Sequence, residues 1–469
     1  MAADPAVSQV VFKTAQAAEV RAPLLRVLPH SAAFEICDPT LVLRVSEALQ
    51  DFKLVLRNRQ QYFGRAVVRS LINNGPAMVV EVALEEKSWL NGSLTNGFDG
   101  RKGLGDDFDG FLRGWQKYYL VSDEYKVIIA DLQTFLVELR LWLEQVELGI
   151  RARSPEERLR VQTEIAQDLR DRIILALSSM FQRFEEVTNR VEDDLQLAHR
   201  AFGQRQLHSH LLCAPFIHRT YSKPLGYAGD YEMMNMIVRN GFEGPSLFAR
   251  LVNAYLLDQA PAHAVRNRVR FLQEHIVVET ARLARSGRVA KILNIACGPA
   301  WEIRNFIAEH ALAENAHFYL LDFNEETLNH TSHLVAEVKR RHGRRTQTEM
   351  VQNSVHKLLK ADIRPTPDEP RYDFIYSSGL YDYLSNRVCK ALNSYLYERL
   401  TPGGLLVVGN FANNNPIKRL MEHALEWFLI YRSGEQLASL SPDQAPPDQC
   451  VIKSEATGTN IFLEVRKPL

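Results

Sequence analysis

The pattern of apolar and polar residues predicts a small β domain over residues 1–105. Two Val-rich apolar runs in this region are separated by the turn residues Asn73, Asn74 and Gly75, which is typical of a hairpin. The region ends in a passage of small polar residues, LNGSLTNGFDGRKGLGDDFDGF. This passage predicts an exposed connection, with a domain boundary near residue 105.

Residues 106–210 follow a helical period. In YKVIIADLQTFLVELRLWLEQVELGI the apolar residues recur three and four positions apart, which predicts a long helix with one buried face. Ser154 is followed by Pro155, Glu156 and Glu157, a sequence typical of the start of another helix. The serine can cap the helix, and the acidic residues suit the positive end of its dipole. We therefore expect a helical region.

Residues 211–287 are expected to form a strap of loops and helices. The first part of the strap, CAPFIHRTYSKPLGYAGDYEMMNMI, is rich in aromatic residues. It also contains Pro215, Pro224, Gly226 and Gly229, which favour turns.

Residues 288–469 alternate strands with helices. Strands are expected at KILNIACG, FYLLDF, TEMVQNSV, DFIYSS, LLVVGNF, CVIKS and NIFLEVR. Helices are expected from Glu302, from Glu325, around Ser385–Leu400 and through MEHALEWFLIYRSG. Strands joined by single helices run parallel, whereas the last two strands, joined without a helix, pair antiparallel. The pattern predicts an α/β fold with a doubly wound, mixed sheet of seven strands.

The composition is that of a soluble globular protein with several domains. Of the 469 residues, 46% are hydrophobic and 24% are charged, so the chain can bury more than one core. The 56 Lys and Arg residues balance 56 Asp and Glu residues, which disfavours nucleic acid as a partner. The five cysteines do not have zinc-ligand spacing, so no metal is expected. Without a membrane-spanning run or a signal-peptide pattern, we expect a cytoplasmic protein.

The first strand of the α/β region ends in a short turn, Asn294–Ala300, directly before a helix. In open α/β sheets such a turn brings backbone N–H groups to the carboxyl edge, where ligands bind. The second strand ends at Asp322, whose carboxylate can accept both hydrogen bonds of a ribose diol. The pair predicts a nucleoside pocket. A dinucleotide is disfavoured, because Gly298 alone represents the GxGxxG pattern that a pyrophosphate needs.

Four segments of this region resemble the successive motifs of class I S-adenosylmethionine-dependent methyltransferases: ILNIACGPAWEI, LLDFNEET, YDFIYSSGLYDYL and LTPGGLLVVGNF. The resemblance implies a Rossmann-like domain with S-adenosylmethionine as its cofactor. It assigns Asn294, Ala296 and Gly298 to the methionine end, Asp322, Phe323 and Asn324 to the ribose and adenine, Ser354 and Val355 to the adenine, and Ser377, Ser378 and Gly379 to the reacting sulfonium.

The first turn departs from that family in two ways. Asn294 stands where the family has an acid, and Ala296 and Ala300 stand where it has glycines. We expect alanine to permit a tight turn only where φ stays negative. The departures leave open a second hypothesis, in which a degenerate methyltransferase fold serves as the scaffold of a nucleotide-sensing protein.

Further motifs resemble bacterial 3-hydroxypalmitic acid methyl ester biosynthesis methyltransferases. They are KPLGYAGDYE, Gln259-Ala260-Pro261, Arg266-Asn267-Arg268, Glu426-Trp427, Tyr431-Arg432 and the ending TGTNIFLEVRKP. This resemblance implies methylation of the carboxylate of a hydroxy fatty acid to a diffusible ester, a quorum-sensing signal. The acceptor could instead be another small molecule of secondary metabolism, methylated on nitrogen or oxygen, with His218 or His423 as the base.

Candidate catalytic residues lie in the strap and after the fourth strand. They are Tyr227, Asp230, Tyr231 and Tyr381, and Tyr383 beside the last of these could also touch substrate. The tyrosines offer hydroxyl donors on apolar rings, although each could also simply fill the core. Methylation of a carboxylate joins an anion to a sulfonium and needs no strong base, so positioning and desolvation would do most of the work.

The N-terminal β domain loosely resembles a PilZ-type barrel, in which an RxxxR run and a DxSxxG turn clamp cyclic-di-GMP. Arg57, Arg59, Arg65 and Arg69 are present, and the last two have RxxxR spacing, but the turn SLINNG lacks the acid. Dinucleotide sensing is one interpretation. The other is a docking module, or homo-oligomerisation through the β domain or the helical region.

Overall fold

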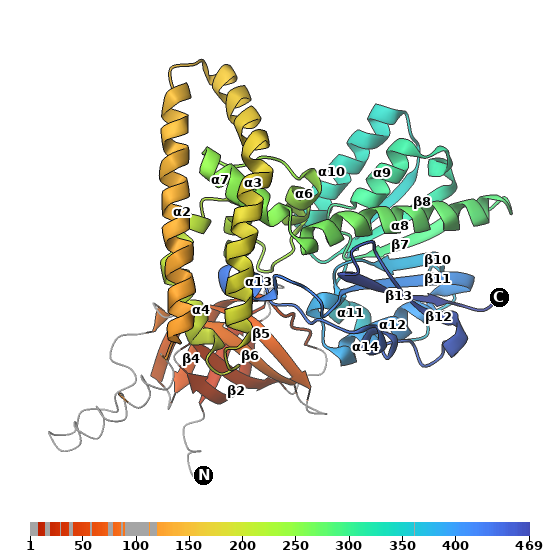
Figure 1. The fold of residues 1–469 in the computed structure, drawn as a ribbon. Coiled ribbons are helices and arrows are strands. Elements are labelled where there is room, and N and C mark those ends of the chain that lie inside the picture. Colours follow the sequence, from red (N-terminus) through yellow and green to blue (C-terminus); the bar gives the residue numbers. More distant parts are fainter. Residues whose placement is uncertain are drawn as a thin grey trace, which may run out of the picture.

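The computed structural model describes residues 8–14, 19–28, 30–36, 41–56, 59–73, 78–85, 88–89, 112, 120–360 and 362–469. Figure 1 shows a β-barrel formed by the N-terminal strands, two long helices that rise from it, and a helix-covered sheet beside them. The predicted exposed connection and Arg57 lie outside the described residues. None of the described helices is long and apolar enough to cross a membrane.

The N-terminal strands close into an antiparallel barrel. They are β1 (Gln9–Lys13), β2 (Glu19–Leu28), β3 (Ser31–Ile36), β4 (Ala48–Leu56), β5 (Arg59–Asn73) and β6 (Met78–Leu84). Their order around the barrel is β1-β2-β3-β6-β5-β4, and the pairing of β4 with β1 closes it. Alternate residues point inward, where the rings of Phe12, Phe34 and Phe52 pack with centroids 5.3, 5.9 and 6.0 Å apart. The predicted hairpin is the pairing of β5 with β6.

Two long helices, α2 (Asp123–Ile150) and α3 (Pro155–Asn189), stand side by side on the barrel (Figure 1). α3 begins where the sequence predicts. The Ser154 side chain accepts from the Glu157 N–H at 3.3 Å, and the Glu157 carboxylate accepts from the Ser154 N–H at 3.3 Å. The apolar faces of both helices share one core with α4 (Gln196–Leu211).

The strap consists of four helices and one tight loop. The helices are α5 (Pro215–Ser222), α6 (Tyr231–Arg239), α7 (Leu247–Leu257) and α8 (Ala260–Ala284). In the loop 223–230, Lys223, Gly226 and Gly229 have positive φ angles of 48°, 83° and 79°. Asp230 ends the loop and caps α6, because its carboxylate accepts from the Met233 N–H at 2.8 Å.

The C-terminal sheet has the predicted seven strands. They are β7 (Ala290–Ile295), β8 (Ala316–Asp322), β9 (Gln347–Gln352), β10 (Tyr372–Ser377), β11 (Leu400–Phe411), β12 (Cys450–Ser454) and β13 (Asn460–Arg466). The order is β12-β13-β11-β10-β7-β8-β9, and β13 runs antiparallel to both neighbours. The mixed α/β sheet with its reversed C-terminal strand is therefore confirmed.

Helices cover both faces of this sheet. One face packs against α8, α9 (Trp301–Glu309) and α10 (Glu325–His342). The other packs against α11 (Val355–Lys360), α12 (Asn386–Glu398) and α14 (Gly434–Ala438). This layering places the carboxyl ends of β7, β8 and β10 at one edge, where the strap lies.

The prediction of a helix through MEHALEWFLIYRSG is wrong beyond its first four residues. α13 covers Lys418–Ala424 and ends there, and Glu426 has a φ of 49°. The chain leaves the helix because its next side chains are bound elsewhere: the carboxylate of Glu426 binds arginines, and the Trp427 indole donates to the Tyr383 hydroxyl at 2.9 Å.

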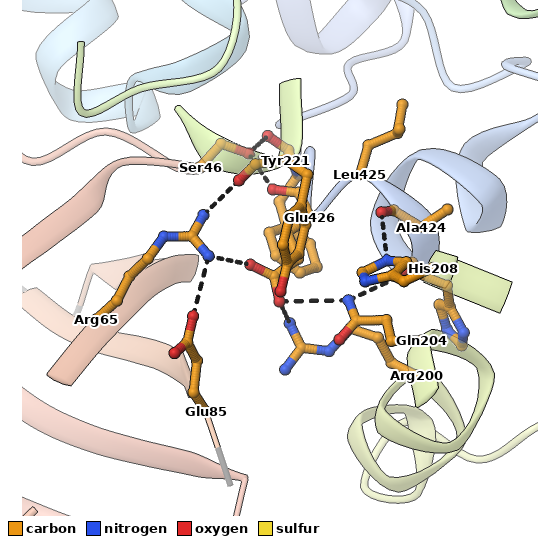
Figure 2. Close-up of polar contacts among 12 residues, drawn as sticks. Ser46, Arg65, Glu85, Arg200, Gln204, His208, Tyr221, Ala424, Leu425 and Glu426 are labelled. Atoms are coloured by element: carbon orange, nitrogen blue, oxygen red, sulfur yellow. Dashed lines mark hydrogen bonds and ion pairs between the residues drawn. The ribbon is translucent and has the colours of Figure 1, made fainter. Parts of the chain in front are cut away.

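Glu426 joins the barrel, α4 and the sheet domain (Figure 2). Its carboxylate oxygens lie 3.1 Å from an Arg65 nitrogen and 2.9 Å from an Arg200 nitrogen. Arg65 also donates to the Tyr221 carbonyl at 2.7 Å, which adds the strap to the cluster. Burial opposes the ionisation of Glu426, but the positive charges of Arg200, Arg65 and Lys223 outweigh burial and lower its pKa to about 2.

The two arginines with RxxxR spacing make contacts within the chain. Arg65 lies 3.4 Å from Glu85 in addition to its contact with Glu426, and Arg69 lies 3.6 Å from Glu81. Both guanidinium groups therefore have carboxylate partners in the folded protein.

We expect Glu426→Gln to lower the free energy of unfolding at pH 7 by about 3 to 5 kcal/mol, since it leaves two arginines without their shared carboxylate. The pKa of Glu426 is lower in the folded chain than its ordinary value of 4.5, so its contribution is complete above that pH and is lost as the pH falls towards about 2. Urea unfolding between pH 7 and pH 3 measures both effects. Glu164→Gln, on an exposed side chain, is the control. Equal stability of the Glu426 variant and the parent chain at pH 7 would contradict the role of this cluster.

Candidate functional site

The turn between β7 and α9 is built from three residues with positive φ. The φ angles of Ala296, Gly298 and Ala300 are 54°, 51° and 47°, so the expectation of negative φ at the alanines is wrong. The turn is held by two backbone bonds, Cys297 N–H to Leu321 O at 3.0 Å and Ala300 N–H to Cys297 O at 3.1 Å. The alanines therefore adopt a glycine-like, left-handed conformation, which costs about 1 to 2 kcal/mol of conformational energy for each residue.

Asp322 lies beside this turn at the end of β8. Its carboxylate accepts from the Gly298 N–H at 3.3 Å and from the Asn324 N–H at 3.1 Å. The side chain lines a cavity and the residue is 4% exposed. Burial raises the pKa of Asp322, while these N–H donors favour its ionised form. An ionised carboxylate here can accept hydrogen bonds from a ribose diol.

Eight residues expected in the site line this cavity: Tyr227, Tyr231, Ala296, Gly298, Asp322, Phe323, Ser378 and Gly379. An adjoining cleft, which shares Phe323, is lined by Asn324 and Ser354. The turn, the second-strand acid, the third-strand end and the fourth-strand end are thus brought together at one sheet edge, as the sequence predicts.

Tyr227 lies on the side of the cavity that the cofactor residues form. Its ring centroid is 5.3 Å from that of Phe323, and its hydroxyl bonds to Thr327. Tyr231 lies at the rim, where its hydroxyl donates to Glu326 at 2.8 Å. The strap therefore covers the second-strand end.

Five expected residues lie outside the cavity lining: Tyr381, Asp230, Ser377, Val355 and Asn294. The Tyr381 hydroxyl donates to Asn393 at 2.5 Å in the core, and Tyr383 of the same short helix lines the cavity instead. The Asp230 carboxylate caps α6 and pairs with Arg219 at 2.8 Å. Ser377 donates to the Ile295 carbonyl at 2.9 Å. The fourth, Val355, is 4% exposed and packs in the core.

Asn294 lies beneath the first turn rather than on the cavity wall. Its amide nitrogen donates to Glu302 at 3.0 Å, and Glu302 also accepts from the Tyr376 hydroxyl at 2.8 Å. The other amide atom of Asn294, Oδ1, is buried and has no hydrogen-bond partner within the described residues. Asn294 is not among the residues that line the cavity, so this acceptor is not presented to the methionine end of a cofactor bound there.

The residues present therefore fit S-adenosylmethionine. Asp322 would hold the ribose hydroxyls, the turn at Gly298 would hold the methionine end, and Phe323 with Ser354 would flank the adenine.

Sequence reasoning assigned no role to several cavity residues. Arg44 comes from the segment before β4, Met234 from α6, Arg268 from α8, and Asp382 and Trp427 from later loops. Arg268 and Trp427 belong to the quoted motifs, which is a signal that could have singled them out. Arg44 had no such signal, because its neighbours in the cavity are distant in sequence.

Comparison with known proteins gives one family match. Residues 226–434 match the model of a family described as "Putative methyltransferase". No curated protein matches the chain.

Solved structures with distant similarity include three examples. A possible exported protein from Bordetella parapertussis is 14% identical, with 68% of this chain and 100% of that chain covered and a TM-score of 0.39. Magnesium protoporphyrin IX methyltransferase from Synechocystis PCC 6803 with bound SAH is 13% identical. The similarity covers 44% of this chain and 87% of that chain, with a TM-score of 0.31. N-methyltransferase NodS from Bradyrhizobium japonicum WM9 with S-adenosylhomocysteine is 14% identical. The similarity covers 51% of this chain and 98% of that chain, with a TM-score of 0.29.

The family match agrees with the predicted enzyme class. It supports a methyltransferase, and the residues that line the cavity fit S-adenosylmethionine as its cofactor.

We expect Asp322→Ala to weaken binding of S-adenosylhomocysteine by about 1 to 3 kcal/mol, roughly 5- to 150-fold, because charge-assisted hydrogen bonds to the ribose are lost. Calorimetric titration measures the affinity, and thermal unfolding shows whether the variant is folded. Asp368→Ala, at an exposed position, is the matched control. An affinity equal to that of the control would show that Asp322 does not hold the ribose.

Proposed function

We propose that this methyltransferase methylates the carboxylate of a small or fatty hydroxy acid and releases a methyl ester. The observation that carries the proposal is the guanidinium group of Arg268, which lines the cavity from α8.

Arg268 is a buried cation without a fixed anion. The residue is 6% exposed and forms no ion pair in the described part of the chain. One of its nitrogens donates to the Met234 thioether sulfur at 3.4 Å. Burial lowers the pKa of Arg268, although Asp382 and Tyr383 favour its charged form. Because a buried charge without a partner is costly, an anionic ligand would be stabilised beside it.

The position of Arg268 favours an acceptor as this anion. One guanidinium nitrogen lies 2.9 Å from the point where a Cβ on residue 379 would stand, so the guanidinium occupies space that a side chain at Gly379 would need. Gly379 follows the fourth strand, where the methyltransferase resemblance expects the reacting sulfonium. An acid held by Arg268 would therefore present its carboxylate at the reacting end of the cavity.

The cavity lining also contains apolar and aromatic residues. Met234, Leu380, Phe411 and Trp427 line it, and Met234 contacts Arg268. An alkyl chain suits such a lining, because contact with it removes apolar surface from water. The combination of one buried cation with an apolar wall supports an amphipathic acid as the substrate class.

S-adenosylmethionine, when bound, supplies a methyl group on a positively charged sulfur. Arg268 would orient the acceptor carboxylate, and Trp427 with Phe411 would exclude water from it. Because the nucleophile is already an anion, no residue has to remove a proton. Orientation and desolvation by these side chains would then account for most of the acceleration.

A second candidate is methylation of a hydroxyl or amine, and Asp382 favours it. Its carboxyl group lines the cavity, and burial raises its pKa to about 6, which suits a general base. With such an acceptor, kcat/KM would rise as the pH passes through about 6, and Asp382→Asn would abolish turnover. With an acid acceptor we expect Asp382→Asn to stay active and kcat/KM to show no rise through that pH.

The acceptor class is tested with alkyl compounds that have the same number of carbon atoms and different head groups. We expect methyl transfer to 3-hydroxyhexadecanoate and hexadecanoate, detected as a product that releases methanol in base. Hexadecanol and hexadecylamine should accept no methyl group. Transfer to the amine or the alcohol without transfer to any acid would overturn the proposal.

The role of Arg268 is tested with Arg268→Met. We expect KM for the acid to rise at least tenfold, while the affinity for S-adenosylhomocysteine stays within about threefold. Arg270→Met, at an exposed position of the same helix, is the control. Loss of S-adenosylhomocysteine affinity with an unchanged KM would instead assign Arg268 to the carboxylate of the cofactor.

A further inference from the structure

A segment of the barrel chain, residues 41–48, lies against three segments that line the catalytic cavity. The Val45 N–H donates to the Tyr383 carbonyl at 3.0 Å, and the Ala48 N–H donates to the Gly226 carbonyl at 2.7 Å. The Ser46 hydroxyl donates to the Phe428 carbonyl at 2.8 Å.

Each of these contacts is made at, or directly beside, a residue of the cavity. Tyr383 lines the cavity itself, Gly226 precedes Tyr227, and Phe428 follows Trp427. The three cavity segments come from the strap, the loop after β10 and the chain after α13. The segment 41–48 is thus a common support for walls that come from distant parts of the sequence.

The same segment sends one side chain into the cavity. The guanidinium carbon of Arg44 lies 4.2 Å from the ring centroid of Phe323 and 5.9 Å from that of Tyr227. A guanidinium stacked on an aromatic face is attracted by the ring quadrupole and restricts the ring. Phe323 follows Asp322 directly and belongs to both the cavity and the adjoining cleft.

Arg44 also acts on Asp322 through its charge. Burial raises the pKa of Asp322, and Arg44 is a cation that opposes this rise. Within the described residues, Tyr227 and Cys297 also interact electrostatically with Asp322, and burial raises the pKa of each, so both are neutral at pH 7. The arginine therefore favours the ionised carboxylate that a ribose diol requires.

We propose that the barrel completes the cofactor site, with Arg44 as the positioning residue that fixes Phe323 and keeps Asp322 charged. The barrel is then a part of the enzyme's binding machinery and not only an appended module. This inference does not depend on which acceptor is methylated.

The test is the affinity of the full-length chain for S-adenosylhomocysteine, which needs no acceptor. We expect Arg44→Gln to weaken binding about tenfold at pH 7.5 and further at a lower pH, because Asp322 loses the nearby charge and takes up a proton more readily. Arg44→Lys keeps the charge and should restore the pH dependence of the parent chain. Arg21→Gln, on an exposed side chain of the same barrel, is the control.

A double-mutant cycle separates this role from a general loss of structure. We expect Arg44→Gln to cost less affinity in a Phe323→Leu background than in the parent chain, because the contribution through the ring is gone while the effect of the charge on Asp322 remains. Ser46→Ala should weaken binding although Arg44 is intact, since it loosens the supporting segment. Affinities within twofold of the parent chain for Arg44→Gln at both pH values, or an equal loss in the Phe323→Leu background, would overturn the proposal.

Discussion

The buried carboxylate of Glu426 is the interaction on which the arrangement of barrel, helices and sheet depends. It binds Arg65 of β5 and Arg200 of α4, while the next residue, Trp427, faces the catalytic cavity. A buried ion pair adds little net stability compared with an apolar core, but the loss of one partner is strongly destabilising. The cluster therefore acts mainly by fixing how the barrel, α4 and the sheet domain are placed relative to one another. Through the neighbouring Trp427 it also fixes the position of one cavity wall.

The catalytic cavity is a composite of elements with different origins. The carboxyl ends of β7, β8 and β10 supply the residues expected to hold the cofactor, as the alternation of strands and helices predicts. The remaining walls come from the strap, the loop after α13 and the barrel segment 41–48. A doubly wound sheet offers only an open edge, so the enclosure of a ligand bound there has to be provided by these added parts.

Sequence reasoning succeeded where local pattern decides the structure. The helix start at Ser154, the mixed sheet of seven strands and the approach of Asp322 to Gly298 all follow from local patterns. It failed where distant partners decide. The helix beyond Ala424 is interrupted because the partners of Glu426 are 226 and 361 positions away. Tyr381 is buried in the core, whereas Tyr383 lines the cavity. Which of the two side chains faces the cavity depends on the orientation of one short helix, and the sequence pattern does not specify that orientation.

The contact between Ser46 and Phe428 has a consequence for the order of events during synthesis. These residues are separated by 382 positions, so at the usual rate of about 5 to 20 residues per second the barrel waits roughly 20 to 80 s for its partner. Until then the segment 41–48 lacks the residues after α13 that it contacts in the folded protein. A nascent polypeptide on the ribosome therefore contains all the strands of the barrel long before it has a complete cavity, and catalysis can begin only after Phe428 has emerged.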